Sequence, residues 1–345
     1  MLSKALSSAL LPSLIGSCLL TAMVGGALEP IPAKAAAAQT YAADVNSRTS
    51  PEISGVTVTT PNPPTEQELE GDNLYRFIMH HATTPYFSTP TARNLARWRG
   101  GKQSICPLTA GLDPGDNAFV TARLRALAAY VGAPVQSNPQ CKANVHILFT
   151  SNPQEQMDAV MNWVTAPGNF GTKYSGGMRD LLAYTSGHAI QGWYMTTSSG
   201  PLVLNTDAES VGLDVEPVWP RIAQNWNDVD RVGTRMVGGS GGGIGIAVVI
   251  LFVDTTKVAG YRIGTIADYL AMLALSMAQS PDHCDSLPSI LDLMSSSCGN
   301  REKPAAITAG DLAFLKALYY RNTGLSPSLS RAAIEANMMQ QLRRR

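Results

Sequence analysis

The chain has 345 residues, of which 45% are hydrophobic and 15% are charged, and its acidic and basic residues balance to a formal net charge of zero. This composition is typical of a globular protein with a sizeable core. Because no basic stripe with interleaved aromatic residues is present, nucleic acid is not an expected partner.

The first 35 residues have the layout of a secretory signal peptide. Lys4 precedes a long apolar run, and the segment "EPIPAKA" then places Ala33 and Ala35 at the −3 and −1 positions of a cleavage site before Ala36. Residues 1–35 are therefore predicted to be removed on export, which gives a periplasmic or secreted protein without a membrane span after cleavage.

Two alternatives to this cleaved signal peptide are weaker. An uncleaved membrane anchor is opposed by Pro12 and by the pair Gly25–Gly26, which interrupt the apolar run. Lipidation at Cys18, in the loosely lipobox-like "LIGSC", is the minor alternative because the apolar run continues past it.

Residues 36–65 are rich in Ala, Thr, Ser and Pro, and they offer few large side chains for burial. They are predicted to form a disordered leader. The remaining residues, 66–345, are predicted to form one globular domain.

Helices and strands are expected in mixed order along this domain. Apolar residues at helical spacing, together with start and stop signals, predict helices at 68–82, 116–132, 152–164, 267–277, 308–323 and 330–342. Runs rich in β-branched and aromatic residues predict strands at 144–150, 190–197 and 244–255. This order indicates an α/β or α+β domain with a small mixed sheet and packed helices.

Four cysteines remain after removal of the signal peptide, an even number in a compartment that permits disulfides. Four cysteines allow three connectivities, and the spacings suggest the local pairs Cys106–Cys141 and Cys284–Cys298. A zinc site built from all four is the competing interpretation, but the chain lacks any C-x-x-C spacing.

The segment "VGGSGGGIG" contains a G-x-S-x-G pattern around Ser240, and Asp254 and His283 follow in the order of an α/β-hydrolase triad. A nucleophile elbow requires a strand before the serine and a helix after it. Here a polar loop precedes Ser240 and a predicted strand follows it. A flexible loop that leads into a buried strand explains the glycines more simply than a triad or a dinucleotide site.

The five histidines give no metal spacing. His80 and His81 are adjacent, so on a helix they point about 100° apart and do not share a metal-binding face. Taken singly, each histidine is interpreted as structural; the five are His80, His81, His146, His188 and His283.

A strand, an apolar helix, a turn and the segment "PSILDLM" together have the layout of a zinc-protease active site. In the metzincin pattern H-E-x-x-H-x-x-G-x-x-H, three histidines bind zinc and a glutamate acts as general base. Aligned with this helix, the three ligand positions fall on Ala267, Ala271 and Met277, and the glutamate position falls on Asp268. The helix is therefore predicted to bind no catalytic zinc, and no cofactor is expected.

Several segments resemble an uncharacterised family of secreted bacterial proteins, which in turn resembles a group with a metzincin-like fold and a degenerate zinc helix. The segments are "RWRGGKQSICP", "NVHILFT", "FVDT", "IADYLAMLALS", "LPSILDLM" and "ITAGDLAFLKALYYRN". The resemblance covers roughly residues 95–325. It implies a fold rather than a reaction.

The expected function is that of an exported, non-catalytic, metalloprotease-like protein that binds an unknown ligand or protein, or has a structural role, in the cell envelope. The former substrate cleft is its expected contact surface. The alternative is a hydrolase that uses Ser240, Asp254 and His283, or a repurposed cleft around Asp268. The enzyme class stays open, although Asp268 also fits a structural role as an acid in a first helical turn.

Overall fold

The computed structural model describes residues 62–81, 95–100, 104–165, 188–197, 245–278, 283–320 and 331–344. All of them belong to the compact unit that runs from Pro51 to Arg345. The predicted signal peptide, Cys18, Ser240 and almost all of the predicted leader lie outside the described residues.

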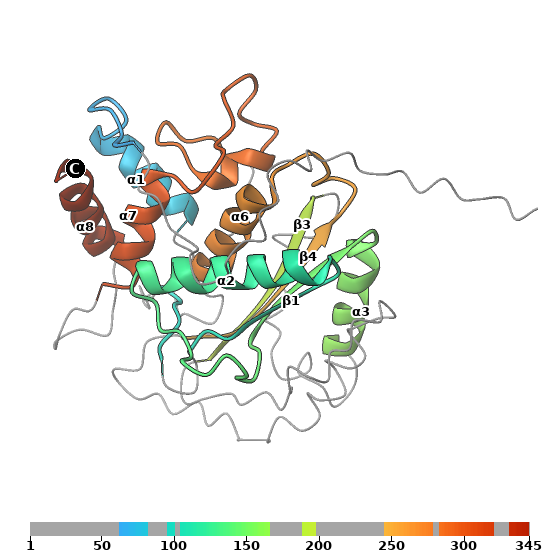
Figure 1. Cartoon of the computed structure of the whole chain (residues 1–345). Coiled ribbons are helices and arrows are strands. Elements are labelled where there is room, and N and C mark those ends of the chain that lie inside the picture. The colour runs from blue at the N-terminus through green and yellow to red at the C-terminus, as the bar shows by residue number, and fades with distance from the viewer. Residues whose placement is uncertain are drawn as a thin grey trace, which may run out of the picture. The chain divides into compact units, whose positions relative to one another are not determined.

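A four-stranded mixed sheet lies at the centre of the domain (Figure 1). Its order is β1 (Pro107–Ala110), β2 (Val145–Thr150), β4 (Gly245–Asp254) and β3 (Ile190–Thr197). The first three strands are parallel, and β3 pairs with β4 in the antiparallel sense. The predicted α/β class with a small mixed sheet is confirmed. Strand β1 was not predicted.

Helices cover both faces of this sheet. On one face, α2 (Pro114–Tyr130) and α6 (Ile263–Ser276) pack in a single hydrophobic cluster with the inward residues of β2, such as Ile147 and Phe149. On the other face lies α3 (Pro153–Thr165), drawn to the right of the strands in Figure 1. Because side chains alternate along a strand, neighbours of the core residues, such as Gln191 beside Ile190, point toward α3.

Local sequence signals set the helix boundaries. Pro114 opens α2, where its missing N–H is not needed. Gly132 follows its end with φ +82°, a conformation that favours glycine. At the N-terminus of α7 (Ala309–Leu318), the Thr308 side chain accepts from Asp311 N while the Asp311 carboxylate accepts from Thr308 N, which forms a capping box.

Helices α1 (Gly71–His81), α7 and α8 (Arg331–Arg343) lie together, on the left of Figure 1. The helix predicted at 68–82 begins at Gly71, and a turn held by reciprocal hydrogen bonds between Thr65 and Glu68 precedes it. The apolar face of α8 then buries Ile334, Met338 and Leu342.

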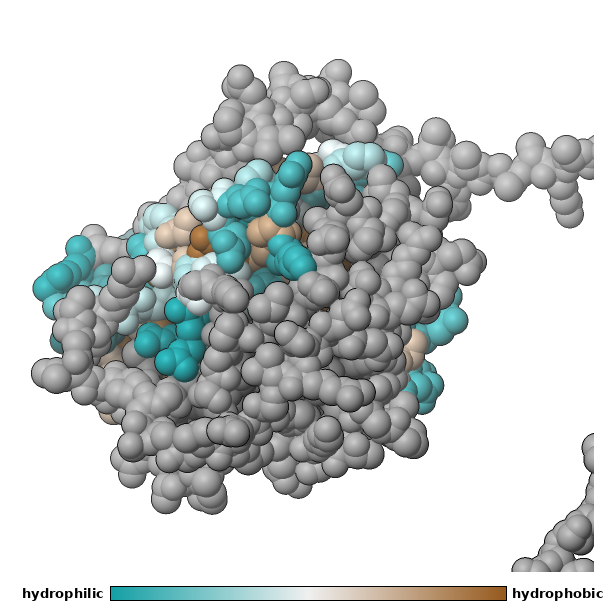
Figure 2. All heavy atoms as spheres, turned by 90° about the horizontal axis from the view of Figure 1, so that it is seen from below, coloured by the Kyte–Doolittle hydropathy of each residue, from teal (hydrophilic) through white to brown (hydrophobic). Residues whose placement is uncertain are grey.

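Both predicted disulfides form as local pairs. Cys106 is bonded to Cys141, and Cys284 is bonded to Cys298. Within the described part of the chain, every helix is too short or too polar to cross a membrane. On the face seen in Figure 2, the described residues are mainly hydrophilic, with a few apolar residues among them.

Candidate functional site

Helix α6 is the predicted position of the degenerate zinc site, and it is packed on every side. Ala267 and Ala271 have no exposed surface, and Met277 is 3% exposed. All three belong to the main hydrophobic cluster. The methyl groups of alanine cannot bind a metal, and a methionine thioether is a poor ligand for zinc.

Aromatic residues from three other segments hold the end of α6. The Trp98 indole donates to the carbonyl of Ala274, and the hydroxyls of Tyr194 and Tyr319 donate to the carbonyls of Leu273 and Leu275. The bonds to Ala274 and Leu275 satisfy carbonyls that a helix end leaves unpaired, while the Leu273 carbonyl also accepts from the backbone N–H of Met277. The volume around the end of the helix is therefore filled by protein side chains.

Asp268 is buried and fully engaged. Its carboxylate accepts two hydrogen bonds from the Arg123 guanidinium, at 2.6 and 3.0 Å, and one from the backbone N–H of Ile307 at 3.0 Å. Only 1% of the residue is exposed. The carboxylate therefore joins α2, α6 and the segment before α7, and it does not face an open cleft.

The segment Pro288–Met294 lies next to α6 and contains the short 3-10 helix η5 (Ile290–Met294). Asp311 of α7 caps both this helix and its own. One carboxylate oxygen accepts from the Ser289 hydroxyl at 2.7 Å, and the other accepts from the backbone N–H groups of Ile290 and Thr308. A single buried carboxylate thus fixes η5 against α7.

His81 extends this network from α1. Its Nε2 lies 3.1 Å from Ser289 Oγ, and its Nδ1 donates to the carbonyl of Phe77. Burial lowers the pKa of His81, and the nearby Asp311 partly opposes this shift. The serine stands between the histidine and the acid, which is not the order of a catalytic triad, and all three residues are buried. The network is structural.

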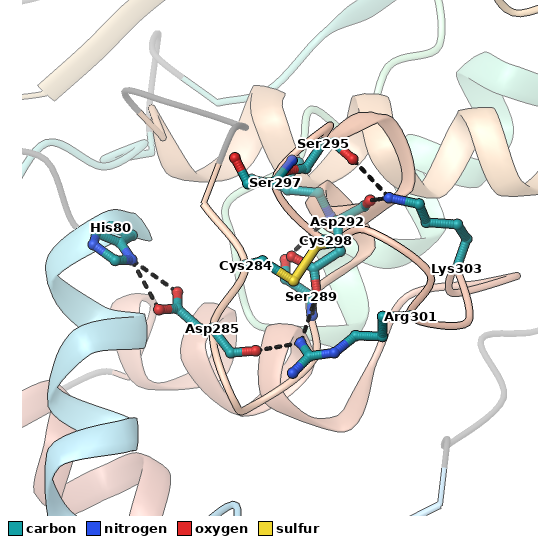
Figure 3. Close-up of a disulfide and its surroundings, with 11 residues drawn as sticks. His80, Cys284, Asp285, Ser289, Asp292, Ser295, Ser297, Cys298, Arg301 and Lys303 are labelled. Atoms are coloured by element: carbon teal, nitrogen blue, oxygen red, sulfur yellow. Dashed lines mark hydrogen bonds and ion pairs between the residues drawn. A yellow bond between two sulfur atoms is a disulfide. The ribbon is translucent and has the colours of Figure 1, made fainter.

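The loop closed by Cys284–Cys298 carries several charged groups (Figure 3). Asp285 accepts from His80 Nδ1 at 2.9 Å, and the His80 ring stacks on His283 with centroids 3.7 Å apart. The Lys303 ammonium donates to the carbonyls of Asp292 and Ser295.

Asp292 lies beside this disulfide. Burial raises the pKa of its carboxyl to about 6, although a hydrogen bond from Ser289 opposes the shift. Cys284, Asp292 and Cys298 are close enough to share one metal ion. Since the two sulfurs are joined to each other, this arrangement offers no thiolates while the disulfide is intact.

A cavity of about 620 Å³ opens at the carboxyl ends of β2 and β4, the edge at which open α/β sheets commonly bind ligands. The residues after β2, the first turn of α3, Gln191 of β3 and the turn after β4 line it. Gln191 is 2% exposed, and Asp254 is 6% exposed.

Asp254 is held as a carboxylate at this cavity. Its Oδ1 accepts from Thr256 N, Thr256 Oγ1 and Lys257 N. Burial raises the pKa of Asp254, but these hydrogen bonds and the Lys257 ammonium outweigh it and hold the pKa below its usual value. The cavity and Gln191 were not predicted, because residues distant in the sequence form them.

Two residues of the predicted triad, Asp254 and His283, are among the described residues, and each has different interaction partners. Asp254 bonds within its own turn, and His283 stacks on His80 of α1. Ser240 lies outside the described residues, so the triad stays a prediction.

Of the other histidines, His146 is buried in β2. Burial lowers its pKa to about 4, and its Nε2 has no hydrogen-bond partner.

Comparison with protein-family models, with curated protein sequences and with solved structures finds no match to this chain. The resemblance to a metzincin-like family therefore stays a proposal.

Proposed function

We propose that this protein is an exported binding protein with a metalloprotease-like arrangement, and that it does not act as a zinc protease. The observation that carries the proposal is the packing of Ala267, Ala271 and Met277 in the hydrophobic core. A catalytic zinc requires three protein ligands and an open position for water. Buried alanines supply neither.

The two disulfides support export, because such bonds persist in oxidising compartments such as the periplasm or the extracellular space. A location in the cell envelope or outside the cell accords with them.

The contact surface is proposed at the cavity beside β2, β4 and α3. The former substrate cleft is a less suitable site, because Asp268 is buried and bound to Arg123. A cavity of about 620 Å³ falls within the range of pockets that bind small molecules. It also presents a buried carboxylate and a buried amide, the kind of polar groups that orient a ligand.

A peptide-hydrolysis assay tests the non-catalytic part of the proposal. The disulfide-bonded protein is incubated with a mixed peptide library, with added zinc and separately with a chelator, and products are followed by mass spectrometry. We expect no cleavage under either condition. Cleavage that depends on zinc and stops with the chelator would overturn the proposal.

The hydrolase alternative has its own test, reaction with a serine-directed fluorophosphonate probe. If the protein is non-catalytic, the wild type and a Ser240→Ala variant should show the same labelling. Labelling of the wild type that this variant abolishes would favour the hydrolase.

A further inference from the structure

Gln191 is a buried amide with an unused acceptor. Its Nε2 donates to Gln154 Oε1 at 3.1 Å, while its buried Oε1 has no hydrogen-bond partner. Leaving such an atom unpaired costs free energy, so an unpaired buried oxygen on a residue that lines a cavity indicates a missing donor.

Asp254 supplies a second acceptor on the same side of the cavity. Gln191 is paired with Phe252 in the sheet, so its side chain lies on the face of β4 that also carries Asp254 two residues later. Asp254 Oδ1 is filled by its own turn, and Oδ2 faces the Lys257 ammonium at 3.6 Å. Together, the two side chains favour a group with several N–H donors, such as an ammonium.

The first turn of α3 offers groups that attract a negative charge rather than a positive one. This 13-residue helix begins at Pro153, and its N-terminal end lines the cavity. Helix N-termini attract anionic groups through their N–H groups and dipole. The half-exposed Lys257 adds a positive charge at the same cavity. Glu155 in the same turn adds a negative charge, so this part of the wall favours a single carboxylate over a group with several negative charges.

We propose that the cavity binds a small zwitterion of the α-amino-acid type. The ligand ammonium would contact Gln191 Oε1 and Asp254, and its carboxylate would lie against the N-terminus of α3 and Lys257. This inference rests on the proposed binding function and names its ligand class. Asp254 and Glu155 disfavour a multiply charged phosphate, while Lys257 and the helix dipole disfavour a simple cation.

The test uses the oxidised protein without its signal peptide and the twenty standard amino acids, first as mixtures and then singly. Thermal shift finds the ligand, and calorimetry gives its Kd. We expect at least one amino acid to bind, and we expect its N-acetyl and methyl-ester derivatives to bind at least tenfold more weakly. The absence of binding, or equal binding of both derivatives, would overturn the inference.

Two matched variants locate the site. Gln191→Met removes the unpaired oxygen at similar volume, so we expect at least a tenfold loss of affinity with an unchanged or higher Tm. Gln156→Met is the control, because Gln156 of α3 also has a buried oxygen without a partner but lies outside the cavity lining. Its affinity should equal that of the wild type. Binding that survives Gln191→Met, or that Gln156→Met abolishes equally, would contradict the assignment.

These outcomes are separate from those of the hydrolysis assay. If the protein neither cleaves peptides nor binds amino acids, the non-catalytic function stands and only the inferred ligand class is wrong. A protein that cleaves peptides with zinc would lose the proposed function itself, whatever it binds.

Discussion

Asp268 and Arg123 form an ion pair between α6 and α2 in which the Asp268 side chain is 2% exposed and the Arg123 side chain is 11% exposed. Removing one partner of a buried pair leaves the other charge without compensation, which costs more than the pair itself contributes. The backbone N–H of Ile307 would also lose its acceptor. A residue that the sequence left open as a candidate base is therefore expected to matter for stability.

Asp268→Ala should lower the free energy of unfolding by about 3–5 kcal/mol. Urea denaturation followed by circular dichroism measures the change. Asp116→Ala, at an exposed position in the first turn of α2, is the control and should change stability by about 0.5 kcal/mol or less. Equal small effects at both positions would show that the ion pair is not structural.

His146 makes stability depend on pH. Its pKa is about 4 in the folded protein and 6.5 in the unfolded chain, so the unfolded state binds more protons between these values. Stability from this group is therefore present above pH 6.5 and is lost as the pH falls toward 4. Asp292 acts in the opposite sense, because its raised pKa makes the folded state bind more protons between pH 3.8 and about 6.

The His146→Leu variant isolates this contribution from that of Asp292. Relative to the wild type, its free energy of unfolding should increase by about 2 kcal/mol when the pH is lowered from 7 to 4.5. Parallel denaturation curves at the two pH values measure the difference. A difference between variant and wild type that is the same at both values would contradict the buried, neutral histidine.

At the scale of the elements, strong local signals in the sequence were sufficient for most helices and strands. The helix predicted at 152–164 and the strand predicted at 190–197 match α3 and β3 closely. Strand β1 was not predicted because it has only four residues and begins with Pro107. It is defined by its pairing with β2 rather than by a pattern in its own sequence.

The candidate site was less predictable than the elements. The burial of α6 followed from its apolar composition, but the partner of Asp268 did not, since Arg123 is 145 residues away in the sequence. The same holds for Gln191, whose role depends on α3 covering its face of the sheet.

Introducing histidines into α6 tests whether this helix is core or a vacant metal site. The double variant Ala267→His/Ala271→His places two large polar rings where no surface is exposed. Overpacking and unpaired nitrogens should each cost about 1–3 kcal/mol. We expect a destabilised protein without tight zinc binding, measured by thermal unfolding with and without zinc. A variant that zinc stabilises to the wild-type Tm would contradict this account.

At the scale of the whole molecule, the two disulfides close loops around different parts of the domain. Cys106–Cys141 spans 35 residues between the start of β1 and the segment before β2, and Cys284–Cys298 spans 14 residues around η5. In the chain-entropy model the longer loop contributes more stability, about 4 against about 3 kcal/mol.

Removal of each bond by paired Cys→Ser substitution should follow this order. The Cys106→Ser/Cys141→Ser variant is expected to lose about 4 kcal/mol and the Cys284→Ser/Cys298→Ser variant about 3 kcal/mol, measured by urea denaturation. No loss in either variant would indicate that these bonds do not contribute to stability.

Zinc content is the most direct test of the central claim that α6 is core rather than a metal site. The oxidised protein is purified in the presence of zinc, dialysed, and analysed by mass spectrometry for metal per chain. Free thiols are counted in the same sample, because reduced Cys284 and Cys298 together with Asp292 could themselves bind zinc. We predict far less than one zinc per chain when no free thiol is present. One tightly held zinc per fully oxidised chain would contradict the account.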